Sequence, residues 1–309
     1  MKILFASTMS EPDVWMSMLR QALPDAQIIE WQDDAPPTGA EVAVAWIPPD
    51  QLFERETDLR VVFNMGAGVD ALLKLPGLRD STKIVRLEDA GMAVQMAEYA
   101  LHALLRASRS FAHYEQLQQQ KTWSPQPDIR RSQWPVGVLG MGKMGSSVAS
   151  AIAALDYPVA GWSRSPREVP GVQSFHGSEQ FSEFLGRTRV LINTLPLTPE
   201  THGVLNARNL GQLRPDAYLI SMGRGEHLVE EDLISVLDQG HLKGATLDVF
   251  VQEPLPQDHP FWTDKRITIT PHVAAASLPE ETVEQIAGKI RQWQKGQEIS
   301  GVVSRDQGY

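Results

Sequence analysis

A short apolar run, Val136-Gly-Val-Leu139, leads directly into Gly140-Met-Gly-Lys-Met-Gly145, and an Ala-rich helical pattern follows over residues 146–155. Strand, glycine turn and helix in this order are the context that a dinucleotide-binding unit requires. The first glycine permits a tight turn, the second lets the backbone approach a pyrophosphate, and the third lets helix and strand pack closely. The helix N-terminus offers free amides to the anion. A chance glycine-rich turn is the alternative, and a protein kinase is disfavoured because neither H-R-D nor D-F-G occurs.

Two series of apolar runs alternate with helical patterns, which predicts an α/β fold with parallel sheets. The first series covers residues 2–7, 26–30, 41–46, 60–64 and 83–87, and Ser10 is the expected cap of the helix after its first run. The second series covers residues 136–139, 159–163, 190–194, 217–222, 244–249 and 267–270. Residues 92–120 read as one long helix, residues 118–128 as a connector, and residues 280–295 as a terminal helix closed by Gly296.

Composition excludes several classes of function. The net charge of -10 repels nucleic-acid phosphates and anionic membrane surfaces. The chain has no cysteine, so thiol nucleophiles, thiolate metal sites and disulfides are excluded. We find no secretory signal and no apolar run approaching the roughly 18 residues of a membrane span. We therefore expect a cytoplasmic protein without nucleic-acid or membrane partners.

The residues after the second strand of the glycine-loop domain predict which dinucleotide binds. An NAD-binding chain places an acid about 20 residues past the glycine loop, whereas the run here is Gly161-Trp-Ser-Arg-Ser-Pro-Arg167 and the first acid is Glu168. The expected ribose and phosphate ligands are Ser163, Arg164, Ser165 and Arg167. Serine hydroxyls donate hydrogen bonds and arginines pair with a 2′-phosphate, so NADPH is favoured and NADH is expected to bind more weakly.

Three predicted strands of the second half end in polar residues that burial does not explain. These segments are residues 221–225, 247–254 and 270–274. Ligands of open α/β sheets lie at the carboxyl ends of strands. Arg224, Glu253 and His272 are therefore candidates for one crevice.

At this point the chain resembles the D-isomer-specific 2-hydroxyacid dehydrogenases over nearly its whole length. The resemblance rests on the glycine loop, on Asn193-Thr-Leu-Pro-Leu-Thr198 with Thr201 and Gly203, on Gly223-Arg-Gly225, on Asp248-Val-Phe with Glu253-Pro-Leu-Pro256, and on Pro271-His272. Within the family it is most similar to the short reductases that act on glyoxylate and hydroxypyruvate. The resemblance implies reduction of small 2-keto acids.

The residues suit this chemistry. Arg224, planar and always charged, would clamp the substrate carboxylate and polarise its carbonyl. His272 is the expected acid, because an imidazole exchanges its proton near neutral pH. Glu253 would hydrogen-bond the ring and favour its protonated form. The nicotinamide supplies the hydride, and no metal is needed. The other seven histidines lack such motifs and are interpreted as structural.

The resemblance and the glycine loop together give a set of binding residues. Cofactor-binding residues are expected at Gly140, Gly142, Lys143, Met144, Gly145, Ser163, Arg164, Ser165, Arg167, Leu195, Pro196, Thr201 and Asp248. Asp248 is assigned from the family, and capping of a turn is its alternative role. Substrate-binding residues are expected at Trp46, Met65, Gly66, Ala67 and Gly68, where successive glycine-loop amides form an anion-binding nest. An ordinary turn at Met65–Gly68 and a core position for Trp46 are the alternatives.

The expected organisation is a Rossmann-type dinucleotide domain inserted into a flavodoxin-like substrate domain. Residues 1–97 and 278–309 would form the substrate domain, and residues 98–277 the NADP-binding domain. The resemblance implies a homodimer, with Trp123 where related reductases send a tryptophan toward the neighbouring subunit, although Lys121 replaces the usual glycine. The rival interpretation is a dinucleotide-sensing corepressor or binding protein on the same fold.

Overall fold

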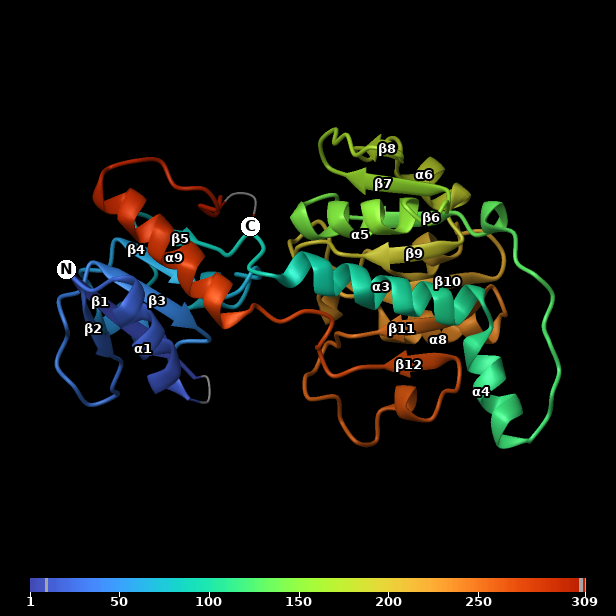
Figure 1. The fold of residues 1–309 in the computed structure, drawn as a ribbon, viewed down its shortest axis with the longest axis horizontal. Coiled ribbons are helices and arrows are strands. Elements are labelled where there is room, and N and C mark those ends of the chain that lie inside the picture. Colours follow the sequence, from blue (N-terminus) through green and yellow to red (C-terminus); the bar gives the residue numbers. More distant parts are fainter. Residues whose placement is uncertain (9–10, 306–307, 309) are drawn as a thin grey trace. The chain divides into compact units, whose positions relative to one another are not determined.

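The computed structural model describes residues 1–8, 11–305 and 308, and the chain divides into two compact units (Figure 1). Unit 1 combines residues 1–91 with residues 277–309, and unit 2 consists of residues 92–276. The sequence analysis placed the first boundary at residue 97, which lies inside helix α3 (Met92–Ser108). The structure keeps this helix whole in unit 2, where it packs against α5 (Lys143–Ala153).

Among the described residues of unit 1, five strands form a parallel sheet in the order β2-β1-β3-β4-β5. The strands are β1 (Lys2–Ser7), β2 (Gln27–Glu30), β3 (Val42–Trp46), β4 (Val61–Asn64) and β5 (Lys83–Val85). The helices are α1 (Pro12–Ala22), α2 (Leu52–Arg55), the 3-10 helix η1 (Leu72–Lys74) and α9 (Pro279–Gln294). Helix α9 lies beside α1 (Figure 1), so the two parts of the chain build one flavodoxin-like unit. Ser10, the expected helix cap, lies outside the described residues.

Unit 2, whose residues are all described, contains a seven-stranded parallel sheet in the order β12-β11-β10-β9-β6-β7-β8. The strands are β6 (Val136–Leu139), β7 (Val159–Ser163), β8 (Val172–His176), β9 (Val190–Asn193), β10 (Ala217–Ser221), β11 (Leu242–Leu247) and β12 (Ile267–Ile269). The helices are α3, α4 (Phe111–Gln119), η2 (Arg131–Gln133), α5, α6 (Phe181–Arg187), α7 (Ala207–Leu210), η3 (Gly225–His227), α8 (Glu230–Asp238) and η4 (Pro260–Trp262). This is a doubly wound order. Strands β7 and β8 are added on one side of β6, and strands β9 to β12 are added on its other side. The expected α/β fold is confirmed.

Two elements of unit 2 differ from the sequence prediction. Strand β8 was not predicted, because it lies at the sheet edge and buries only Phe175 among polar neighbours. The predicted helix over residues 92–120 is broken into α3 and α4 at Ser110, whose φ of 57° is left-handed. Helical periodicity continues across this break, and so periodicity alone did not reveal it.

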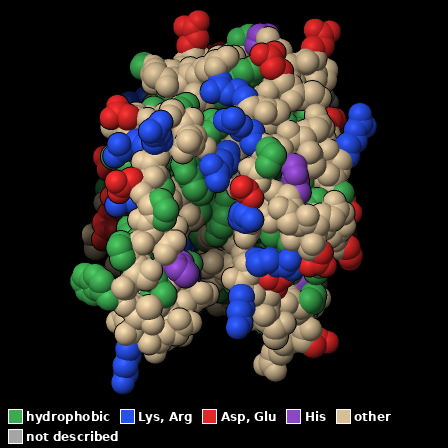
Figure 2. Space-filling view, turned by 90° about the vertical axis from the view of Figure 1, so that its right-hand side faces the viewer, with side chains coloured by type: hydrophobic (Ala, Val, Ile, Leu, Met, Phe, Trp, Pro, Cys, Tyr) green, Lys and Arg blue, Asp and Glu red, His purple; other side chains and the backbone are tan. Residues whose placement is uncertain are grey.

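The connector predicted over residues 118–128 begins later in the structure, because α4 continues to Gln119, and residues 122–130 have no regular structure. Lys121 adopts the left-handed φ of 55° that the glycine of the family would take without strain. Trp123 is 99% exposed. A cavity of about 480 Å³ opens between α3, α4 and the connector. Figure 2 views this side of the molecule and shows hydrophobic side chains at the bottom of a hollow with Lys and Arg side chains beside it.

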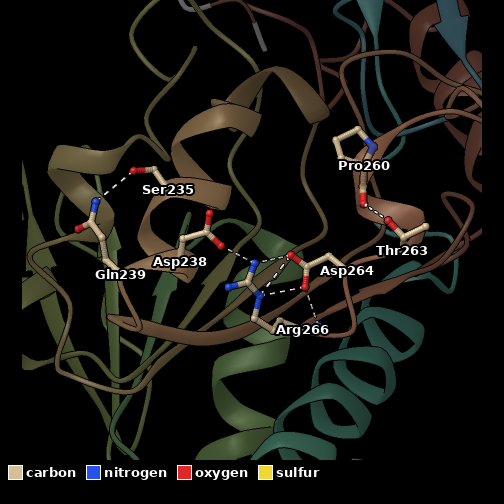
Figure 3. A network of polar contacts seen from close by, with 7 residues as sticks. All are labelled: Ser235, Asp238, Gln239, Pro260, Thr263, Asp264 and Arg266. Carbon is tan, nitrogen blue, oxygen red and sulfur yellow. Dashed lines mark hydrogen bonds and ion pairs between the residues drawn. The ribbon is translucent and has the colours of Figure 1, made fainter.

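A polar network fixes the start of β12, the strand that leads to the predicted acid (Figure 3). Arg266 donates from Nε and Nη2 to the carboxylate of Asp264, with the shortest contact at 2.6 Å. Its Nη2 also donates to Asp238 at the end of α8, at 2.8 Å. The hydrogen bond from Arg266 lowers the pKa of Asp264. Arg266 thereby ties the amino end of β12 to the carboxyl end of α8.

Candidate active site

The three glycines of the loop after β6 each occupy a different environment. Gly140 adopts a left-handed φ of 94° at the turn itself. A Cβ on Gly145 would lie 1.8 Å from the carbonyl oxygen of Gly140, so only glycine allows this approach of helix to strand. A Cβ on Gly142 would meet nothing within 4 Å. Gly142 therefore borders open space at the first residue before α5, where the initial helical amides have no intrahelical acceptors.

The loop after β7 begins with basic and hydroxyl side chains, and its first acid is Glu168. The Ser163 hydroxyl donates to the backbone carbonyl of Ser165 at 2.7 Å, which holds the turn. Arg164, Ser165 and Arg167 are all exposed. The pKa of the neighbouring Glu200 is lowered, first by its own backbone amide, then by Thr198, and also by the charge of Arg164. The charge of Arg164 therefore reaches the carboxylate of Glu200.

The loop after β9 is braced by its own side chains. The Thr201 hydroxyl donates to the carbonyl oxygen of Pro196 at 2.7 Å and accepts from the amide of Thr198 at 2.8 Å. Asn193, the last residue of β9, is fully buried and accepts from the amide of Leu195 at 3.2 Å. A buried amide side chain at a strand end is a signal in the motif that the sequence analysis did not use. The loop is rigid where the cofactor residues Leu195, Pro196 and Thr201 were predicted.

The predicted catalytic residues follow three strands that are neighbours in the sheet, β10, β11 and β12. Half-buried Arg224 lies directly after β10 in extended conformation, and its Nη1 donates to the carbonyl of Gly223 at 2.9 Å. A Cβ on Gly225 would lie 1.9 Å from the carbonyl carbon of Phe250, three residues past the end of β11. The backbone of the arginine loop therefore lies directly against the loop that carries Glu253.

His272 and Glu253 form an ion pair or hydrogen bond of 2.8 Å between Nδ1 and Oε2. The other carboxylate oxygen, Oε1, accepts from the amide of Phe250 at 2.9 Å, which fixes Glu253. Both side chains are partly solvent-exposed, at 45% for His272 and 37% for Glu253. Within the described residues, nothing hydrogen-bonds to Nε2 of His272. This nitrogen is the one that could exchange a proton with a bound molecule.

A buried network holds the backbone around His272. Its φ is 54°, a left-handed conformation that costs a non-glycine residue about 1 kcal/mol or more. The carboxylate of Asp248, only 1% exposed, accepts from the amides of Val273 at 2.9 Å and Ala274 at 2.8 Å. The backbone carbonyl of Asp248 accepts from the amide of His272 at 2.8 Å. These contacts are those of the turn-capping role for Asp248, and its contact with the cofactor stays a prediction.

The network continues to helix α3 through two residues that the sequence analysis missed. The Thr270 hydroxyl donates to Asp248 Oδ1 at 2.6 Å, and the Tyr99 hydroxyl lies 2.6 Å from the same Thr270 oxygen. Because Thr270 gives its proton to Asp248, Tyr99 donates to Thr270. Burial raises the pKa of Tyr99 to about 12. Thr270 stands in one of the predicted polar segments but was given no role there, and Tyr99 lies far from these motifs in the chain.

In unit 1, the structure brings the predicted substrate-binding residues together at the ends of β3 and β4. A Cβ on Gly66 would lie 2.0 Å from the ring of Trp46, so the indole packs directly on this loop. The Asn64 amide donates to the carbonyls of Gly66 at 2.9 Å and Gly68 at 2.8 Å. Across the described ranges, the amides of Gly66, Ala67 and Gly68 have no protein acceptor. The carbonyls of Gly66 and Gly68 are engaged, while these three amides remain available to an anion.

In the part of the chain that the structure describes, no group of three or more His, Asp or Glu side chains has the geometry of a metal site. In the same residues, none of the helices has the length and apolar character needed to cross a membrane.

Comparison with known proteins gives the family and the fold. Residues 101–274 match the model of the D-isomer specific 2-hydroxyacid dehydrogenase NAD binding domain. The chain is 47% identical to glyoxylate/hydroxypyruvate reductase A of Serratia proteamaculans and 44% identical to that of Escherichia fergusonii, in each case over 100% of both chains.

Two solved structures are similar over the full length. One is a D-isomer specific 2-hydroxyacid dehydrogenase from Xanthobacter autotrophicus Py2 in complex with NADPH, with a TM-score of 0.94, 35% identity and coverage of 100% of this chain and 99% of that one. The other is an NADPH-dependent glyoxylate/hydroxypyruvate reductase from Sinorhizobium meliloti in complex with NADP and sulfate, with a TM-score of 0.93, 34% identity and the same coverage.

Proposed function

The chain belongs to the D-isomer specific 2-hydroxyacid dehydrogenase family, and on this premise we propose that it reduces small 2-keto acids with NADPH, glyoxylate to glycolate and hydroxypyruvate to glycerate. The observation that carries the proposal is the 2.8 Å contact of His272 with Glu253, beside the loop of Arg224 on the neighbouring strand. An imidazole held by a carboxylate is a proton donor, and a guanidinium is a clamp for a carboxylate. Reduction of a 2-keto acid needs both.

The environment of the glycine loop fits a dinucleotide. Open space at Gly142 and the amino end of α5 suit a pyrophosphate. We assign this contact to Gly140, Gly142, Lys143, Met144 and Gly145. Ser163, Arg164, Ser165 and Arg167 are assigned to the ribose and its 2′-phosphate, because they supply donors and positive charge without an acid. Leu195, Pro196 and Thr201 are assigned to the nicotinamide side.

Each catalytic side chain then has a defined task. Bound NADPH supplies the hydride for the carbonyl carbon. Arg224 holds the substrate carboxylate and polarises the carbonyl oxygen. The Nε2 atom of protonated His272 donates its proton to that oxygen, and Glu253 stabilises the imidazolium and fixes the ring through Nδ1. We assign Asp248 to positioning His272 through the amides that follow it.

We further propose that the loop from Met65 to Gly68 binds a carboxylate and that Trp46 limits the size of the bound acid. The three available amides of the loop and the indole packed on Gly66 support this assignment. A small pocket favours acids of two or three carbons over larger ones. We place the reaction in the cytoplasm, in line with the absence of cysteine.

We also propose that the protein acts as a homodimer through its connector. Support comes from Trp123, whose indole is 99% exposed and therefore accessible to a second subunit. Sedimentation of the purified protein and of Trp123→Ala tests this: we expect a dimer that the substitution weakens. A monomeric wild-type protein would contradict it.

The decisive experiment measures steady-state oxidation of NADPH and of NADH in parallel, against glyoxylate, hydroxypyruvate, pyruvate and larger 2-keto acids. We expect fast turnover with NADPH and the two- and three-carbon acids. Tight NADPH binding without turnover of any acid would instead favour the dinucleotide-sensing corepressor or binding protein.

A further inference from the structure

His227 is a fully buried histidine whose two ring nitrogens are both engaged. It ends η3, three residues after Arg224. Its Nδ1 lies 3.0 Å from the backbone nitrogen of Arg224 and 3.0 Å from Nδ2 of Asn193, and its Nε2 lies 3.2 Å from the carbonyl oxygen of Pro196. A backbone N–H only donates, so Nδ1 is the acceptor and Nε2 carries the proton that Pro196 accepts. These hydrogen-bond partners favour the neutral imidazole of His227 with its proton on Nε2.

The ring thereby joins two loops that leave neighbouring strands, β9 and β10. On one side is Pro196, and on the other is the amide of Arg224. The backbones of the two segments are also linked, since the amide of Leu205 donates to the carbonyl of His227 at 2.8 Å. A Cβ on Gly223 would lie 2.9 Å from both Asn193 Nδ2 and His227 Nδ1, which shows how closely the three groups pack.

We propose that His227 is a positioning residue that sets the substrate loop of Arg224 and the cofactor loop of Pro196 in register, and that protonation of its ring releases both loops. The proposal rests on the proposed function, which assigns these loops to substrate and cofactor. It revises the interpretation of His227 as merely structural.

The electrostatic environment favours the neutral ring. Burial lowers the pKa of His227, and the charge of Arg224 lowers it further, against opposing effects of the Pro196 carbonyl and of Glu226. These two charged side chains come from the same loop as the ring. Asn193, the side chain of β9 that contacts the ring, is neutral, and so is Ser221 of β10, which accepts a hydrogen bond from Asn193. A proton on Nδ1 would point at two N–H donors, so the charged ring cannot keep its present contacts.

Amide substitutions separate the two contacts. In His227→Asn the side-chain oxygen lies near the position of Nδ1, but the side chain is too short to reach the carbonyl of Pro196. In His227→Gln the longer side chain can donate to Pro196, but no acceptor remains at the position of Nδ1. We expect His227→Asn to raise the KM for NADPH about three- to tenfold with little change in the KM for glyoxylate, since one hydrogen bond is lost. His227→Gln should show the reverse. Equal changes in both constants for both variants would overturn the proposal.

The matched control is His259, which has the same pattern of contacts outside these loops. Its Nδ1 accepts from the amide of Phe261 at 3.3 Å, and its Nε2 faces Glu230 at 3.2 Å. We expect His259→Asn and His259→Gln to leave both KM values unchanged. If the His259 variants changed one KM selectively, as expected for the His227 variants, the loss of any hydrogen-bonded histidine would give the effect. That result would overturn the positioning role of His227.

A spectroscopic readout makes the test independent of turnover. Nitrogen-15 NMR of the imidazoles in the unliganded protein should show His227 as the Nε2–H tautomer, with a pKa below the ordinary histidine value of about 6.5. NADPH affinity should fall over the pH range in which this ring finally titrates. An Nδ1–H tautomer, or a charged ring at neutral pH, would overturn the proposal. If the wild-type protein reduced no keto acid, the proposed function would fail, while NMR and NADPH binding would still test the ring.

Discussion

Nδ1 of His272 lies 2.8 Å from Oε2 of Glu253, although the two residues follow different strands of the sheet. Each partner is fixed from behind, Glu253 by the amide of Phe250 and the backbone of His272 by the carbonyl of Asp248. The ring is therefore oriented before any ligand binds. Preorganisation of this kind lowers the cost of reaching the reactive geometry.

Replacement of the imidazole should abolish turnover without affecting the cofactor. For His272→Asn we expect kcat to fall by about 10²- to 10⁴-fold, because the proton donor is lost. NADPH binding, followed by fluorescence titration, should be unchanged. Glu253→Gln keeps a hydrogen-bond acceptor but removes the charge, and should give a smaller loss of kcat in the same assay. Wild-type turnover in His272→Asn would remove the residue from the mechanism.

Asp248→Asn should disturb the loop of His272. The NH₂ group of the new amide would face the N–H group of Val273 or Ala274, whose hydrogen bond the carboxylate now accepts, and two donors would then oppose each other. We expect unfolding in urea to show a loss of about 1–3 kcal/mol, and kcat to fall with it. Unchanged kcat in a destabilised variant would limit Asp248 to a role in stability.

Two glycines of the same loop should respond differently to one methyl group. In Gly142→Ala the methyl enters open space, so the free energy of unfolding should be preserved while NADPH binding weakens by about tenfold. In Gly145→Ala the methyl meets the Gly140 carbonyl, which should cost about 1–3 kcal/mol of stability. Calorimetric titration and thermal unfolding of both variants provide the measurement. Undiminished NADPH affinity in Gly142→Ala argues against a pyrophosphate there.

Arg164→Ala should distinguish the two dinucleotides. Loss of a charged hydrogen bond to the 2′-phosphate should weaken NADPH by about 1.5–3 kcal/mol and leave NADH nearly unaffected. Arg208→Ala, an exposed arginine on α7, is the control that should change neither affinity. Equal losses for NADPH and NADH in Arg164→Ala would contradict the phosphate assignment.

Tyr99 should make the protein sensitive to alkali. Its pKa is raised from 10.0 to about 12 in the folded chain, so the unfolded chain loses the proton first and stability falls as pH rises from 10 to 12. This contribution is about 3 kcal/mol at most. At pH 8 Tyr99→Phe should be less stable than wild type, because the variant lacks the hydrogen bond to Thr270. Above pH 10 this difference in the free energy of unfolding should shrink. Thermal unfolding across this pH range tests it; a constant difference between the two proteins would refute it.

Local patterns in the sequence were sufficient for the strands of the two sheets other than β8. The bounds of β1, β6 and β7 agree with prediction, because each is a buried apolar run that ends at a turn signal. Strand β8 escaped prediction because an edge strand buries little and carries no such pattern. The break at Ser110 escaped because a single left-handed residue leaves the helical period on both sides intact.

By itself, the sequence determined that this chain has a glycine loop between strand and helix, basic residues in place of a ribose-binding acid, and polar residues where three strands end. These signals are local, since each depends on residues adjacent in the chain. Only the tertiary structure decided which polar residues meet. The strand order makes β9, β10, β11 and β12 successive neighbours. It pairs Glu253 with His272, turns the buried Asp248 toward the loop of His272, and places His227 between Asn193 and Arg224. Such contacts join residues that are far apart in the chain, and packing of the sheet is the physical cause that brings them together.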